Sequence, residues 1–127
     1  MEKMILIDSN IIIEMLNGKE GSLERILKYD PNQVYISVVT EWEVIAGAYD
    51  KRSQTAYQKA LTRFNIIQFD KQISEHTGIL LKTYGLSHGL NIPDALIAAT
   101  AIKFKIPLLT LNQKDFTFIS GLDLETV

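Results

Sequence analysis

The chain has 127 residues, of which 46% are hydrophobic and 22% charged, and it contains no cysteine. This length and composition are typical of one globular domain over residues 1–127, and they exclude a disordered chain, disulfides and thiolate metal sites. The formal net charge of −2 excludes a general attraction to nucleic acid or to anionic membranes, so any polyanion must be bound by a local patch.

The apolar segments of the sequence are too short for secretion or membrane insertion. Residues 4–7 form an apolar stretch that Asp8 interrupts, whereas a secretory signal needs roughly 7–15 apolar residues in a row. The other apolar run, residues 95–102, is far below the ~18 residues of a membrane span. We therefore expect a soluble protein of the cytoplasm.

Short apolar strands alternate with helical segments in chain order. The predicted strands are MILI (4–7), QVYIS (33–37), NIIQF (65–69) and IPLLTL (106–111). Helical spacing and capping residues predict helices over 9–19, 22–30, 40–49, 53–64, 72–84 and 91–104. Strands that are apolar on both faces and alternate with helices imply a parallel sheet between layers of helices, so the fold class is α/β.

Several polar residues and glycines mark where these helices begin and end. Ser22 and Thr40 are expected to be N-caps, and Gly18 is expected to close the first helix. Residues 85–90 (GLSHGL) are expected to form a glycine-rich loop before the apolar helix that follows Asn91. Ligands of such sheets bind beyond the carboxyl ends of the strands, so the residues at these ends are the candidates for function.

Four carboxylates stand at the ends of predicted strands or near the starts of predicted helices. They are Asp8, directly after the first strand; Glu43, three residues after Thr40; Asp94, three residues after Asn91; and Asp115, three residues after Asn112. The last three also fit helix capping, in which a carboxylate interacts favourably with the first turn. Asp8 is harder to explain in this way, because it lies between two apolar runs and its burial is costly without compensation.

Taken together, the four acids predict a metal site. At one edge of a parallel sheet, three or four carboxylates would raise one another's pKa values unless a cation lay between them. Mg²⁺ is held by a few carboxylates and keeps waters for a substrate phosphate, and this is the chemistry of phosphodiester hydrolysis. Asn10 and Thr110 are candidates to orient the carboxylates, although turn and cap bonding explains them equally well. His76 and His88 lack a partner motif, and we do not expect either to be catalytic.

Basic residues cluster between positions 51 and 69, a stretch without any acid. On a helix, Arg52, Lys59 and Arg63 share one face, because steps of seven and eleven residues bring the chain back to within ~20°. A solvated helix face and a stripe that contacts a polyanion explain this pattern equally well.

Four segments of the chain, in this order and at these separations, resemble the PIN-domain ribonucleases, and specifically the VapC-like toxins of bacterial and archaeal toxin–antitoxin pairs. They are ILIDSNIII (5–13), ISVVTEWEVIAGA (36–48), SHGLNIPDALIAATAI (87–102) and IPLLTLNQKDF (106–116). The resemblance spans essentially the whole chain. It implies a Mg²⁺- or Mn²⁺-dependent endoribonuclease with a five-stranded parallel sheet in a three-layer α/β/α fold. It further implies a homodimer that cleaves RNA and is silenced by a cognate antitoxin.

The resemblance also implies which residues form the active site. The catalytic and metal-binding acids of the family fall on Asp8, Glu43, Asp94 and Asp115. Glu43 fits rather than Glu41, because Glu43 is the glutamate followed by VIAGA. Two positions depart from the family pattern: Asn10 stands where some members carry a second acid, and Leu111 stands where a basic or polar residue is more usual.

Two other classes of protein remain open from the sequence. An α/β phosphatase or phosphotransfer domain also places an aspartate after its first strand, but a phosphatase of that kind needs a second acid two residues later, where this chain has Asn10. A non-catalytic RNA- or protein-binding module would use the acids only as helix caps. Loss of one carboxylate would leave the binding of such a module largely intact.

Overall fold

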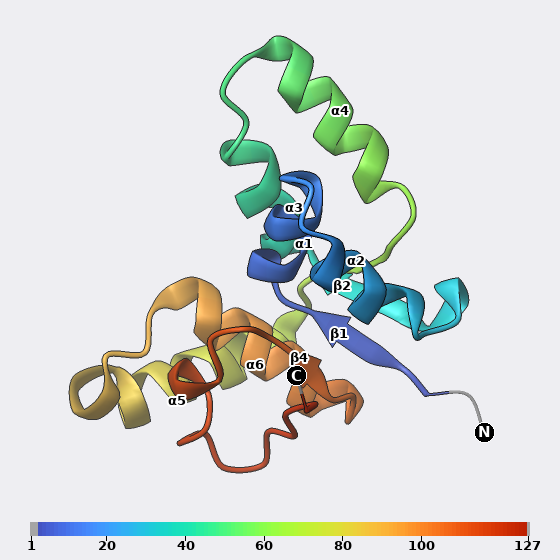
Figure 1. Ribbon diagram of the computed structural model, residues 1–127. Coiled ribbons are helices and arrows are strands. Elements are labelled where there is room, and N and C mark those ends of the chain that lie inside the picture. Colours follow the sequence, from blue (N-terminus) through green and yellow to red (C-terminus); the bar gives the residue numbers. More distant parts are fainter. Residues whose placement is uncertain (1–2, 127) are drawn as a thin grey trace.

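The computed structural model describes residues 3–126, which form four strands and six α-helices (Figure 1). The strands are β1 (Ile5–Ile7), β2 (Val34–Ser37), β3 (Asn65–Ile67) and β4 (Leu108–Leu109). The helices are α1 (Ser9–Leu16), α2 (Glu20–Leu27), α3 (Val38–Ala46), α4 (Lys51–Leu61), α5 (Lys71–His88) and α6 (Ile92–Phe104). None of the helices within this part of the chain is long and apolar enough to cross a membrane.

The strands form one parallel sheet in the order β3-β2-β1-β4. β1 is central, and its Leu6 is aligned with Leu108 of β4. Beyond β4, Leu124 forms a single parallel bridge with Leu108. Two backbone hydrogen bonds hold this tail: the N–H of Leu108 donates to Asp123 (2.9 Å), and that of Glu125 donates to Leu108 (2.8 Å). The sheet therefore has four strands and a one-residue start of a fifth, close to the five that the family resemblance implied.

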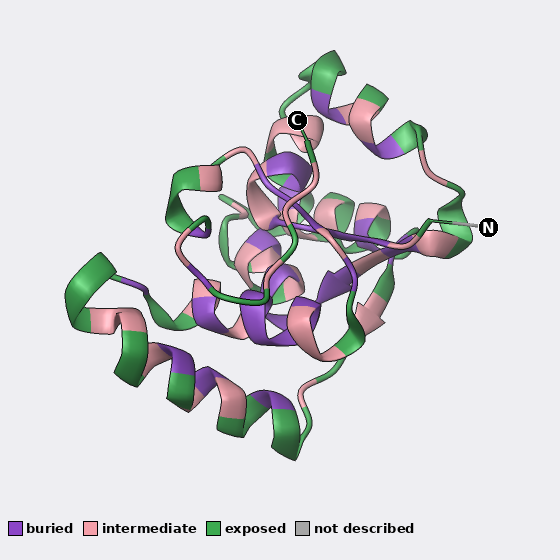
Figure 2. Cartoon of the chain, turned by 90° about the horizontal axis from the view of Figure 1, so that it is seen from below, coloured by how far each residue is buried: buried purple, intermediate pink, exposed green. Residues whose placement is uncertain are grey.

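The side chains of β1 contribute to two hydrophobic cores, because successive residues of a strand point to opposite faces of the sheet. Ile5 and Ile7 pack with residues of α1, α2, α3 and α4, whereas Leu6 packs with residues of α5 and α6. Figure 1 shows these two groups of helices on opposite sides of β1. Figure 2 shows buried residues on the strands and the inward helix faces. The three-layer α/β/α architecture expected from the sequence is confirmed.

Two residues that were predicted to be N-caps lie inside helices that begin earlier. Ser37, the last residue of β2, is the N-cap of α3, because its side-chain oxygen accepts a hydrogen bond from the backbone N–H two residues later (3.2 Å). Thr40 therefore lies inside α3, and Glu43 lies in the second turn rather than the first. The prediction that Thr40 is an N-cap is wrong, and the capping role that the sequence also allowed for Glu43 is absent. Ser22 is likewise inside its helix, which begins at Glu20.

The ends of α4 and α5 also differ from the prediction. The predicted loop at residues 85–90 is mostly helical, since α5 continues to His88 and ends at Gly89. Gly89 has a φ of +70°, a left-handed conformation that glycine adopts without strain. α4 ends before Arg63, so the predicted helical face of three basic residues is reduced to Arg52 and Lys59.

Candidate active site

Asp8 lies where β1 ends and α1 begins, and the residue is almost fully buried (5% exposed). Its Oδ1 accepts a hydrogen bond from the backbone N–H of Ser9 (2.7 Å), which makes Asp8 the N-cap of α1. Its own N–H donates to the carbonyl of Leu109 in β4 (3.0 Å). The carboxylate is thus fixed at the carboxyl edge of the sheet, between β1 and β4.

Thr110 and Asn10 hold the second carboxylate oxygen of Asp8. The Thr110 hydroxyl donates to Oδ2 (2.8 Å), and the Asn10 amide donates to the same oxygen (3.4 Å). The hydroxyl also accepts from the Asn10 amide (3.2 Å) and from the N–H of Asn112 (3.1 Å). Of the two roles that the sequence left open for Asn10 and Thr110, contact with the Asp8 carboxylate is present, and the buried hydroxyl uses its full bonding capacity.

Two further acids reach this edge of the sheet from helices. Glu43 projects from α3 and is half-buried, and its Oε1 is buried without a hydrogen-bond partner among the described residues. Asp94 lies in the first turn of α6 and is also half-buried. Asn91 caps this helix by accepting a hydrogen bond from the N–H of Asp94 (2.9 Å), so the predicted cap is confirmed.

Asp115 is the most exposed of the four acids and lies in a short 3-10 helix, Gln113–Asp115. Asn112 precedes this helix but makes no side-chain capping bond, so the predicted cap at Asn112 is wrong. The four acids therefore extend from Asp8 in the interior to Asp115 at the surface.

The four carboxylates interact electrostatically. Burial, and then the charges of the other three acids, raise the pKa of Asp94 from 3.8 to about 6. Burial followed by the charge of Asp8 raises the pKa of Glu43, against a smaller opposing effect of the Ser9 hydroxyl. Burial also raises the pKa of Asp8, with a small contribution from Asp115, although its hydrogen bonds act in the opposite direction. The structure thus brings together the four acids that the sequence singled out.

These side chains fit a divalent cation that keeps most of its water. Within residues 3–126, no three acidic or imidazole side chains are close enough to enclose an ion by themselves. Mg²⁺ usually binds only one or two protein carboxylates directly and retains several waters. The unpaired Oε1 of Glu43 and the repulsion among the acids are features that a cation would relieve. A donor set made of carboxylates suits Mg²⁺ or Mn²⁺.

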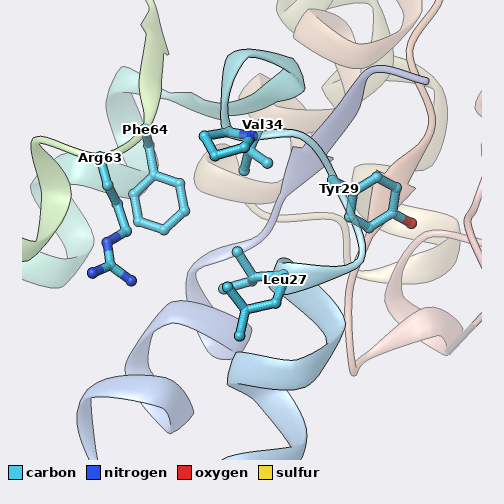
Figure 3. A pocket seen from close by; sticks show the side chains of 7 residues that line it. Leu27, Tyr29, Val34, Arg63 and Phe64 are labelled. Atoms are coloured by element: carbon cyan, nitrogen blue, oxygen red, sulfur yellow. The ribbon is translucent and has the colours of Figure 1, made fainter. Parts of the chain in front are cut away.

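An apolar hollow of about 310 Å³ lies at the opposite edge of the sheet (Figure 3). Its lining comes from the end of α2 and from the segments that precede β2 and β3, and it includes Leu27, Tyr29, Arg63 and Phe64. None of the described residues that line it carries a carboxylate, so they offer no acidic ligand to a cation. The acids therefore define the candidate active site.

Known proteins are similar to this chain over most of its length. Residues 5–120 match the PIN domain family. The chain belongs to the PIN-domain family. A protein named Ribonuclease VapC from Rickettsia bellii is 32% identical over 97% of this PIN domain and 96% of its own length.

Solved structures agree with this assignment. A chain in a toxin–antitoxin complex from Klebsiella pneumoniae is 35% identical to this PIN domain, with a TM-score of 0.80 over 93% of this chain and 94% of that chain. VapBC2 from Rickettsia felis, solved bound to a DNA fragment from its promoter, is 27% identical with a TM-score of 0.74 over 96% and 97% of the two chains. The similarity therefore covers the sheet and all four acid-bearing segments.

Ser9 is a residue of this PIN domain that the sequence prediction overlooked. Its hydroxyl lies 3.5 Å from Oδ1 of Asp8 and also lowers the pKa of Glu43, so it stands between two of the acids. The signal in the sequence was its place in a run of three polar residues between two apolar segments.

Proposed function

We propose that this PIN domain is a metal-dependent endoribonuclease and the toxin of a toxin–antitoxin pair. The observation that carries the proposal is the group of four carboxylates at the carboxyl edge of a parallel sheet. The negative charges of the group raise the pKa values of Asp8, Glu43 and Asp94, and no positive charge among the described residues is a cause of these shifts. Similarity to a protein named Ribonuclease VapC and to solved toxin–antitoxin complexes supports the proposal.

In this proposal the catalytic residues hold Mg²⁺, with Mn²⁺ as an alternative of the same coordination chemistry. They are Asp8, Glu43, Asp94 and Asp115. A bound ion supplies an activated water molecule and offsets the charge that develops on the scissile phosphate. The carboxylates determine where the ion binds, and their negative charge sets its affinity.

Hydrogen bonds and helix N-termini within the chain position the acids of this site before any ion binds. Thr110, Asn10 and Ser9 fix both oxygens of Asp8, so the carboxylate does not have to reorient when an ion binds. Asp8 caps α1 and Asp94 lies in the first turn of α6, where the helix dipoles favour negative charge. Asp115 is exposed, so it is the acid that an approaching RNA strand reaches first.

The proposal includes the partners of the enzyme. We expect a cognate antitoxin to bind the PIN domain and inhibit cleavage, in keeping with the toxin–antitoxin complexes that it resembles. We also expect the PIN domain to act as a homodimer in the cytoplasm, as the family resemblance implies. Light scattering of the purified protein, alone and mixed with the antitoxin, measures both assemblies.

Metal removal tests the proposed reaction directly. A chelator should abolish cleavage of an end-labelled single-stranded RNA, and Mg²⁺ or Mn²⁺ added in excess should restore it, because the acids alone cannot activate water. The products should be internal fragments, as an endonuclease requires. Cleavage that persists in chelator would contradict the metal site. Hydrolysis of a phosphate monoester without RNA cleavage would instead identify a phosphatase.

Thr110→Val should lower the rate of RNA cleavage about 10- to 100-fold, the usual effect of losing a residue that orients a metal ligand. Valine keeps the shape of threonine but leaves Oδ2 of Asp8 without its 2.8 Å hydrogen bond. Thr110→Ser retains the hydroxyl and serves as the control, so it should cleave at close to the parent rate. Equal rates for all three proteins would show that the hydrogen bond does not position Asp8.

Charge reversal of Arg52 and Lys59 tests the basic face of α4. If they bind RNA phosphates, the double reversal should weaken RNA binding and reduce its salt dependence by ~0.7 in slope for each phosphate that is no longer neutralised. If they instead hold an acidic antitoxin segment, the variant should cleave RNA normally and escape inhibition. Reversal of the exposed Lys28 and Lys82 is the matched control. If the variant is unchanged in both assays, Arg52 and Lys59 bind neither partner and only form a solvated helix face.

A further inference from the structure

Two aromatic rings stack at the surface where α5 ends. The rings of His88 and Phe118 lie nearly parallel, with centroids 4.2 Å apart and planes 13° apart. His88 is the last residue of α5 and is exposed, whereas Phe118 is half-buried. The stack therefore has an inner member covered by the protein and an outer member open to solvent.

The surrounding contacts hold this stack in one arrangement. Tyr84 packs edge-on against His88, with centroids 5.7 Å apart, and against Phe118 at 5.2 Å. The hydroxyl of Tyr84 accepts a hydrogen bond from the N–H of Ser120 (3.2 Å), which ties the segment that carries Phe118 to α5. Ser87 Oγ lies 2.7 Å from Nδ1 of His88 and sets the orientation of the imidazole. An ordered ring presents a face with little further loss of conformational entropy.

Both members of the stack are tied to segments that carry the acids. Phe118 follows Asp115 by three residues, and His88 precedes by three the Asn91 side chain that caps α6 at Asp94. Three residues span at most ~10 Å even when fully extended. Short segments from two different parts of the chain therefore join the stack to Asp115 and to the N-terminus of α6, where Asp94 lies.

We propose that His88 is a base-stacking subsite for the RNA strand, on which the base of a nucleotide next to the cleaved bond rests. This inference rests on the proposed ribonuclease activity. Single-stranded RNA is bound largely by stacking of its bases on aromatic side chains, since every base has a π face. A protein with a net charge of −2 and an acidic site gains little affinity from bulk electrostatics, so a stacking contact is the kind of attraction that it needs.

The test combines changes in the protein with changes in the RNA. A short single-stranded RNA with one mapped cleavage site is compared with versions in which each nucleotide flanking that site lacks its base. The parent protein should lose about 5- to 100-fold in kcat/KM on one abasic RNA, the size of one stacking contact. His88→Ala should cleave the intact RNA at this lower level and no longer distinguish the two. His88→Tyr keeps a ring and should retain the discrimination. His76→Ala, a histidine change on the same helix, should behave like the parent.

The outcomes separate the inference from the proposed function. If the parent cleaves no RNA, the proposed function fails and the inference with it. If the parent cleaves RNA but cleaves every abasic RNA as fast as the intact one, the inference is overturned. It is also overturned if His88→Ala slows cleavage of the intact and abasic RNAs equally, because His88 then only packs against Phe118. A change in oligomeric state of His88→Ala by light scattering would instead identify a subunit contact and also overturn it. RNA binding by anisotropy in an Asp8→Asn background, with and without His88→Ala, repeats the comparison without cleavage.

Discussion

Asp8→Asn is expected to lower RNA cleavage by roughly a thousandfold or more while the protein stays folded. Asparagine retains an oxygen that can accept the hydrogen bond from Ser9 and cap α1, so local structure is preserved. What is lost is the negative charge at the carboxyl edge of the sheet, where the cation is proposed to bind. Because burial and Asp115 raise the pKa of Asp8, removal of the charge should also leave the metal-free protein at least as stable as the parent.

The measurement is RNA cleavage with saturating Mg²⁺, together with a thermal melt of each protein. Asp30→Asn is the matched control, because Asp30 also caps a short helix, accepting from the N–H of Asn32 (2.9 Å), but at the opposite edge of the sheet. The control should cleave at the parent rate. Cleavage by Asp8→Asn at the parent rate would remove Asp8 from the catalytic residues. If the Asp8→Asn protein does not fold, the same cleavage assay and melt are carried out on Asp94→Asn.

Without metal, the melting temperature is expected to rise as the pH falls from about 7 to about 5. The pKa of Asp94 is about 6 in the folded protein and 3.8 in its ordinary environment, so the folded state binds the proton more tightly. Protonation therefore stabilises the fold, and this gain is lost as the pH rises from about 4 through about 6. The raised pKa values of Asp8 and Glu43 act in the same direction.

A divalent cation should reverse this dependence on pH. Above pH 7, saturating Mg²⁺ or Mn²⁺ should raise the melting temperature, because a ligand that binds only the folded state stabilises it by about 2.7 kcal/mol at 100 times its Kd. Near pH 5 the shift should shrink, since protons compete for the same carboxylates. Asp94→Asn should flatten the pH dependence and lose most of the metal response, whereas Asp123→Asn on the exposed tail should do neither. A melting temperature that does not change with added metal at any pH would contradict the proposed metal site.

The sequence was sufficient to predict the order of strands and helices and the meeting of the four acids. Parallel strands leave a strong signal, since they are apolar on both faces. Asp8 follows such a strand directly, and Asp115 comes four residues after the predicted strand 106–111. In a parallel sheet the carboxyl ends all lie at one edge, so convergence of the acids follows from topology. The hydrogen bond from Thr110 to Asp8, by contrast, joins residues 102 positions apart, and only the side-by-side pairing of β1 and β4 explains it.

Helix boundaries were predicted less well, for reasons of local ambiguity. Ser37 and Thr40 are both good N-caps, and the β-branched Val38 and Val39 between them favour a strand. In the fold Ser37 is the N-cap and both valines lie buried in the first turn of α3, which a local pattern does not reveal. The glycine at position 85 was likewise mistaken for a helix end, because a glycine tolerated within a helix and one that terminates it look alike in sequence.

The pairing of Leu124 with Leu108 has a practical consequence for handling the protein. β4 is two residues long, and residues 123–125 satisfy the amide and the carbonyl of Leu108 that face away from β1. Without this cover, Leu108 would stand on an open sheet edge, which pairs readily with strands of other molecules. Proteolytic removal of this segment, or an affinity tag fused close to it, would therefore disturb β4 and with it Thr110, which lies two residues after Leu108. A preparation could then lose activity through self-association although every catalytic acid is still present.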